Sequence, residues 1–187
     1  MPELILADGT RIGSRERIQA TLALLGVDLA HWPVPSSPDI ATLLARRDLS
    51  DSEQQTVLAS VDGQFNHLRR EHGYVSRDLV VLNAGHPATE AALGRFARPH
   101  VHRDDEARYV LDGRGYFVFY DQAEEQLLLE VLAGDFLRVP AGAEHAFVLG
   151  DSPRLKAVRY FTDPAGWVPV YTDRDVPPHV ADIGGTA

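Results

Sequence analysis

The chain contains no cysteine, and this absence excludes disulfide bonds, thiolate metal ligands and cysteine nucleophiles. Basic side chains are in the minority, because 18 Lys and Arg residues stand against 27 Asp and Glu residues and give a formal net charge of -9. A chain with this balance and no basic patch repels nucleic-acid phosphates. We therefore expect no nucleic acid among its partners.

Long hydrophobic runs are absent as well. The longest candidate, Leu127–Leu132, is interrupted by Glu130 and falls far short of the ~18 apolar residues that a membrane helix needs. The N-terminal segment has no basic region leading into a long apolar stretch, so it does not resemble a secretory signal. These absences predict a cytoplasmic protein that does not bind membranes.

The rest of the composition is that of an ordinary globular protein, with 44% hydrophobic and 24% charged residues in 187 positions. This length corresponds to one domain on a prior of about 150 residues per domain, and we expect residues 1–187 to form it. Residues 176–187 are rich in proline and glycine and predict a loosely held C-terminal tail. Without thiols, the chemistry has to come from His, carboxylates, Arg, Tyr or hydroxyl groups.

The first half of the chain is predicted to be mostly helical. Apolar residues three to four positions apart, Ser or Asp caps and following glycines mark the bounds of its segments. The predicted helices are Ser14–Leu25, a short one beginning near Ser37–Asp39, a longer one from Ser50 or Asp51 to about His72, and Pro87–Arg98.

The second half consists of short β-rich runs separated by turn residues. The predicted strands are Asp78–Leu82, His100–His102, Ala107–Leu111, Tyr116–Tyr120, Leu127–Leu132, Phe136–Val139, His145–Leu149 and Leu155–Phe161. The dipeptide Asp112-Gly113 is typical of a hairpin turn. Short strands at regular spacing predict a small barrel or jelly roll. The expected fold class is therefore α+β, mainly β, with helices contributed by the N-terminal half.

Three histidines and one carboxylate are the strongest candidates for a metal site. His100, His102 and Glu106 have the same parity, so their side chains would share one face of a strand. His145 follows on a neighbouring predicted strand, and the four residues together form the sequence pattern H-x-H-x3-E-x38-H. Such a set suits Fe, Ni, Mn, Co or Zn better than Ca or Mg, which prefer oxygen ligands. Asp104 has the same parity as Glu106, so spacing alone leaves both carboxylates open as the ligand.

Two arginines accompany these residues. Arg108 shares its parity with Glu106 and would place a permanent positive charge near the metal. Arg159 lies among inward-facing apolar residues of a predicted strand, where an unpaired guanidinium is costly, so it needs an anionic partner. An internal salt bridge to Glu106 or another acid would satisfy either arginine without any catalytic role.

Two segments resemble the motifs of the cupin superfamily, namely Gly94-x5-His100-x-His102-x3-Glu106-x6-Gly113 and Gly134-x5-Pro140-x-Gly142-x2-His145. Within it, PHVHRDDEARYVLDGRGYFVFYD, GDFLRVPAGAEHAF and KAVRYFTDPAGWVPVYT resemble the acireductone dioxygenase family. The helical first half and EHGYVSRDLVVL also fit, so the resemblance covers most of the chain. Two positions depart from the family pattern. Many members have an acidic residue just before the first histidine, where this chain has Pro99, and often a large side chain just after the last histidine, where this chain has Ala146.

The resemblance implies a cupin-type jelly-roll β-barrel with one Fe(II) per chain, or alternatively Ni(II), held by His100, His102, Glu106 and His145. It implies Arg108 and Arg159 as catalytic residues that stabilise a deprotonated enediol. The implied substrates are O2 and the acireductone 1,2-dihydroxy-3-keto-5-methylthiopentene of methionine salvage. Iron-type members give formate and 4-methylthio-2-oxobutanoate, whereas nickel-type members give carbon monoxide, formate and 3-methylthiopropionate.

Two aromatic residues are the candidates for the wall of the substrate pocket. Phe147 shares a face with His145 and, with Phe161, is expected to line the substrate pocket. We expect a monomer.

One rival function is that of another cupin dioxygenase or an isomerase, since fold does not fix function. The other is a non-catalytic sensor that binds a metal or a small ligand.

Overall fold

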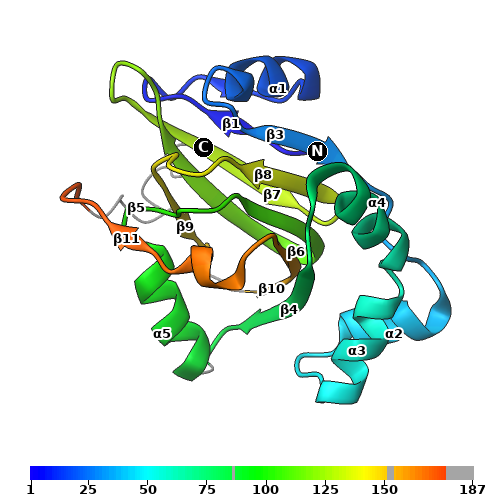
Figure 1. The fold of residues 1–187 in the computed structure, drawn as a ribbon. Helices are drawn as coiled ribbons and strands as arrows, with labels where there is room; N and C mark the ends of the chain where they lie inside the picture. Colours follow the sequence, from blue (N-terminus) through cyan, green and yellow to red (C-terminus); the bar gives the residue numbers. More distant parts are fainter. Residues whose placement is uncertain (86, 151–153, 176–187) are drawn as a thin grey trace.

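Two antiparallel sheets that share one long strand form the centre of the molecule (Figure 1). The computed structural model describes residues 1–85, 87–150 and 154–175, so the tail expected at 176–187 lies outside the described residues. The strands are β1 (Leu4–Ile5), β2 (Arg11–Ile12), β3 (Asp28–His31), β4 (Ser76–Asn83), β5 (His100–Val101), β6 (Glu106–Tyr120), β7 (Gln126–Leu132), β8 (Asp135–Val139), β9 (His145–Val148), β10 (Arg154–Phe161) and β11 (Val170–Tyr171). The helices are α1 (Arg15–Ala23), α2 (Pro38–Ala45), α3 (Asp51–Ala59), α4 (Asp62–His72) and α5 (Pro87–Phe96), with a 3₁₀ turn at Pro164–Trp167.

The α+β fold class is confirmed, and the N-terminal half supplies the helices, of which α2 to α4 group on one side in Figure 1. Sheet A runs in the order β11-β5-β9-β6-β7-β1-β2, and sheet B in the order β4-β10-β6-β8-β3. One hydrophobic cluster joins inward side chains of both sheets with α1, and a second packs α2, α3 and α4 against sheet B. None of the described helices is long and apolar enough to cross a membrane.

The long helix expected up to His72 is two helices, so that prediction is wrong in this detail. Ser50 caps α3 with a capping box to Glu53, and Gly73 ends α4 at a φ of 72°, as expected. Between them the Ser60 hydroxyl donates to the Val57 carbonyl oxygen at 2.6 Å, a side-chain bond that competes with the helical pattern. Asp62 and Gly63 follow, and both are weak helix formers.

The hairpin expected at Asp112-Gly113 is also wrong, because β6 runs without a turn from Glu106 to Tyr120. Gly113 has a φ of +80°, and the register between β6 and β10 shifts at Lys156/Ala157. A bulge of this kind bends a strand. Before it, β6 pairs with β8 and β10, and after it with β7 and β9. The dipeptide thus passes one strand from sheet B to sheet A.

The close approach of the Arg154 backbone leaves no room for a side chain at Gly113. A Cβ there would lie 1.9 Å from the Arg154 carbonyl oxygen. We expect Gly113→Ala to lower the free energy of unfolding by about 2 kcal/mol or more, from strain and overpacking together. The control is Gly63→Ala in α4, where a Cβ meets no atom within 4 Å and a gain of about 0.5–1 kcal/mol is expected. Urea titrations that give both variants the same midpoint would contradict this view of the bulge.

Candidate metal centre

The fold brings the four sequence-predicted donors into one cluster. His100 on β5 pairs directly with His145 on β9, while Glu106 begins β6. One ligand atom from each of His100, His102, Glu106 and His145 lies within 4.8 Å of the others. All four side chains are buried, with Glu106 only 2% and His145 only 1% exposed. Buried charges and imidazoles gathered in this way need a partner to be stable.

Hydrogen bonds fix the orientation of two of the imidazoles. The His100 Nδ1–H donates to the Arg98 carbonyl oxygen at 2.6 Å, and the His145 Nδ1–H donates to the Ala143 carbonyl oxygen at 2.8 Å. These bonds leave the Nε2 lone pairs free to bind a metal. His102 Nδ1 is buried and has no hydrogen-bond partner among the described residues.

The spacing of the donor atoms fits a single ion. Glu106 Oε2 lies 3.0 Å from His102 Nε2 and 3.3 Å from His145 Nε2. Two ligands at right angles, each about 2.1 Å from a metal, are about 3.0 Å apart. Three imidazoles and one carboxylate match a first-row divalent ion. The cluster therefore fits a transition-metal site.

The other carboxylates of this segment have different partners. Asp104 accepts hydrogen bonds from the Thr162 hydroxyl and the Asp163 N–H, whereas Asp105 binds Arg138 and the Ala141 N–H. Glu106 alone of the three joins the described donor cluster. The structure thus separates the two carboxylates that strand parity left open.

The electrostatics favour the metal-binding protonation states of Glu106 and His100. Burial acts to raise the pKa of Glu106, but the Arg108 charge and hydrogen bonds from His102 and His145 hold it well below the usual range. Burial, aided by the nearby His145, lowers the pKa of His100 to about 4. A carboxylate that stays ionised and an imidazole that stays neutral are the forms that coordinate metals.

Both predicted arginines lie at the site, and both are in ion pairs. Arg108 Nε binds Glu106 Oε1, while its buried Nη1 has no hydrogen-bond partner among the described residues. Arg159 binds Asp78 through two hydrogen bonds of 2.8 and 2.5 Å. The anionic partner expected for Arg159 is therefore Asp78, across the β10–β4 register. Both arginines therefore form the internal salt bridges that the sequence allowed, but Nη1 of Arg108 remains without a partner among the described residues.

A cavity of about 250 Å³ opens onto the cluster. Its lining consists of Arg95, Phe96, His100, His102, Glu106, Arg108, Arg159, Trp167 and Pro169. Sequence reasoning missed Arg95, Phe96 and Pro169 as lining residues. The available signal for the first two was their place at the end of a predicted helix just before His100.

The aromatic side chains divide between wall and support. Trp167 stacks on His102 with ring centroids 5.7 Å apart, and its Nε1–H donates to the Asp105 carbonyl oxygen at 3.1 Å. Phe161 lines an adjoining cavity that also contacts Arg159 and Trp167. Phe147 lines neither cavity. Its ring instead lies 5.1 Å from the Arg108 guanidinium carbon and supports that side chain.

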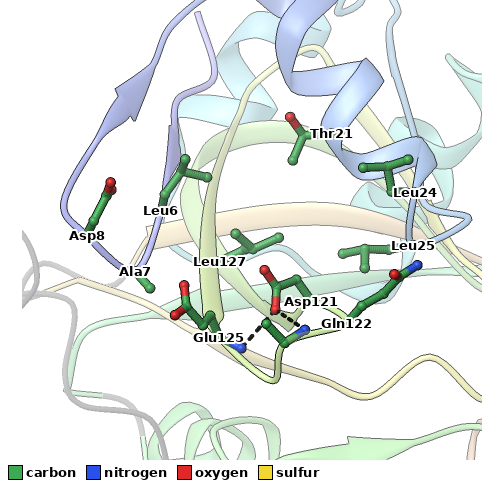
Figure 2. A pocket seen from close by; sticks show the side chains of 11 residues that line it. Leu6, Ala7, Asp8, Thr21, Leu24, Leu25, Asp121, Gln122, Glu125 and Leu127 are labelled. Carbon is green, nitrogen blue, oxygen red and sulfur yellow. Dashed lines mark hydrogen bonds between the residues drawn. The ribbon is translucent and has the colours of Figure 1, made fainter.

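A larger cavity of about 490 Å³ lies between α1, the β1–β2 turn and the β6–β7 turn (Figure 2). Leucines from these segments form much of its lining, with carboxylates of Asp8, Asp121 and Glu125 beside them. Asp121 Oδ1 accepts the N–H groups of Ala123 and Glu125 and so shapes the turn. Because this cavity contains no imidazole, the smaller cavity carries the candidate chemistry.

Comparison with known proteins agrees with this geometry. The chain matches the model of the ARD/ARD' family over residues 34–169. The chain belongs to the ARD/ARD' family. An acireductone dioxygenase of Microcystis aeruginosa is 42% identical over 175 residues, which cover 92% of this chain and 94% of the relative. Another, from Leptospira biflexa, is 38% identical over 162 residues, which cover 87% of this chain and 90% of the relative.

A solved family member extends the agreement to three dimensions. The structure of acireductone dioxygenase from Bacillus anthracis superposes with a TM-score of 0.84 at 28% sequence identity, and the match covers 91% of this chain and 98% of that chain. That protein is described with a cadmium ion in its active centre. The jelly-roll architecture expected from the resemblance to cupins and acireductone dioxygenases is thereby supported along nearly the whole fold.

The two departures from the family pattern have simple structural settings. Ala146 is buried in a cluster with Val118 and Val148, on the face of β9 opposite to His145. Its small size therefore leaves the metal-facing side of β9 unaltered. The Pro99 carbonyl oxygen accepts the N–H of Thr172, which ties the segment after β11 beside the cluster.

Proposed function

We propose that this chain uses a bound metal and O2 to cleave the acireductone 1,2-dihydroxy-3-keto-5-methylthiopentene in methionine salvage. The observation that carries the proposal is the buried cluster of three imidazoles and one carboxylate that opens into a cavity beside Arg108. Membership of the ARD/ARD' family supports the same reaction.

We propose Fe(II) as the resident metal, one per chain, with Ni(II) as the alternative. His100, His102, Glu106 and His145 would hold it. When bound, a divalent metal supplies a Lewis acid that polarises the oxygens of an enediol and a site where substrate and O2 meet. Ligand affinity alone favours nickel over iron. The keto acid product of the iron branch has the clearer use in methionine recycling, and this supports iron.

The protein's own groups would act on the charge and position of the substrate. Arg108 Nη1 is a buried donor without a described partner, so it is available to an enediolate oxygen. Glu106 holds the other edge of the same guanidinium and keeps it in place. Arg159, paired with Asp78, adds a second fixed cation to the wall. Trp167 stacks on His102 and would help to shield this ligand from water.

The test is turnover by metal-loaded protein. The metal-free chain is loaded anaerobically with Fe(II) or Ni(II), mixed with synthetic acireductone and O2, and followed by loss of enediolate absorbance and by product analysis. We expect formate and 4-methylthio-2-oxobutanoate with iron, and carbon monoxide, formate and 3-methylthiopropionate with nickel. Stoichiometric metal binding without acceleration by either ion would refute the proposal and favour another cupin activity or a sensor.

A further inference from the structure

The charges that line the metal cavity are unequally neutralised. Among its cations, Arg108 is paired with Glu106 and Arg159 with Asp78. Arg95 is the third lining arginine, and no carboxylate of the described residues lies within 4.0 Å of its guanidinium. Apart from a bound metal, the described lining therefore offers one cation whose charge is not already neutralised.

Arg95 is placed at the mouth of the cavity and not at its floor. Among the nine described residues that line the cavity, Arg95 alone is exposed to solvent, and the others are buried or half-buried. His100, Glu106 and Arg108 are each less than 5% exposed. It also stands in the last turn of α5, where the helix dipole presents partial negative charge. A cation at that position offsets a field that would otherwise repel an anion.

We propose that Arg95 is a specificity-determining residue that captures the anionic enediolate at the entrance and guides it to the metal. This inference rests on the proposed function, because it takes the substrate to be an acireductone anion. The chain carries a formal net charge of -9, so its overall field opposes the approach of such a substrate. A charge at a rim changes association more than chemistry.

The test compares three charge variants of the metal-loaded protein. Arg95→Gln is expected to lower kcat/KM about two- to fivefold, the range of one exposed charge interaction, with little change in kcat. Relative to the unmodified protein, kcat/KM of this variant should fall less, or rise more, with added salt, because the attraction that salt screens at Arg95 is already absent. Arg95→Lys keeps the charge and should keep most of kcat/KM. Arg70→Gln is the matched control, since Arg70 is exposed in the last turn of α4 and does not line the cavity.

Binding of ascorbate, a stable enediolate, tests the same residue without turnover. Anaerobic calorimetry on metal-loaded protein should show two- to fivefold weaker ascorbate binding by Arg95→Gln than by the Arg70→Gln control. This result together with absent acireductone turnover would refute the proposed reaction but retain anion capture. Equal affinity and equal salt dependence in the Gln variants, or no ascorbate binding by the unmodified protein, would overturn the role of Arg95.

Discussion

Replacing His145 with alanine is expected to abolish stoichiometric metal binding and to lower kcat/KM by more than about 100-fold. Loss of a residue that only supports a metal ligand costs 10- to 100-fold, and His145 contributes a ligand atom itself. Its Nε2 lies 3.3 Å from Glu106 Oε2, and its ring is oriented by the Ala143 carbonyl oxygen. No neighbouring donor of the described residues replaces it in the cluster.

The measurements are metal content per chain after anaerobic loading, and acireductone turnover by the same preparation. His67→Ala is the control, because His67 is an exposed imidazole on α4 away from the cluster. Since His145 also packs near the Phe117 and Phe119 rings, His145→Gln preserves more volume and separates ligand loss from core disruption. One metal per chain in both His145 variants would show that the cluster does not need this imidazole.

The metal cluster was predictable from sequence only in part. Strand parity correctly placed His100 and Glu106 near one another, but the reason is not an unbroken strand, because residues 102–105 lie between β5 and β6. In that gap, contacts of Asp104 with Thr162 and of Asp105 with Arg138 fix the path of the chain. Such contacts join positions more than 30 residues apart, and no local pattern contains them.

The errors in the predicted fold also come from contacts between residues that are distant in the sequence. Asp112-Gly113 has the local chemistry of a hairpin turn. Pairing with β10 before the dipeptide and with β7 after it nevertheless keeps the strand continuous through the bulge. Likewise, the expected burial of Arg159 predicted that an anion lies near it. That this anion is Asp78 depends on the register between β10 and β4, which the sequence does not show. The cytoplasmic location and the monomeric state stay predictions.

Replacing Arg108 with methionine is expected to separate two roles of the guanidinium. In catalysis, removing one donor from a developing oxyanion costs about 10²- to 10³-fold in kcat. In folding, the change leaves the Glu106 carboxylate buried without its cation, which costs about 3–5 kcal/mol in the metal-free protein. A bound divalent metal supplies positive charge to the same carboxylate, so metal loading should restore much of that stability.

The pH dependence provides a further check with a definite sign. Arg108 helps to hold the pKa of Glu106 well below the reference value of 4.5, so this stabilisation is present above about pH 4.5 and is lost as the pH falls. The difference between the metal-free protein and Arg108→Met should therefore shrink on acidification. Arg154→Met is the control, because Arg154 is 51% exposed in its pair with Asp112 and should cost no more than about 1 kcal/mol at any metal content. Equal urea midpoints for metal-free Arg108→Met and the unmodified protein near neutral pH would show that the buried carboxylate does not depend on Arg108.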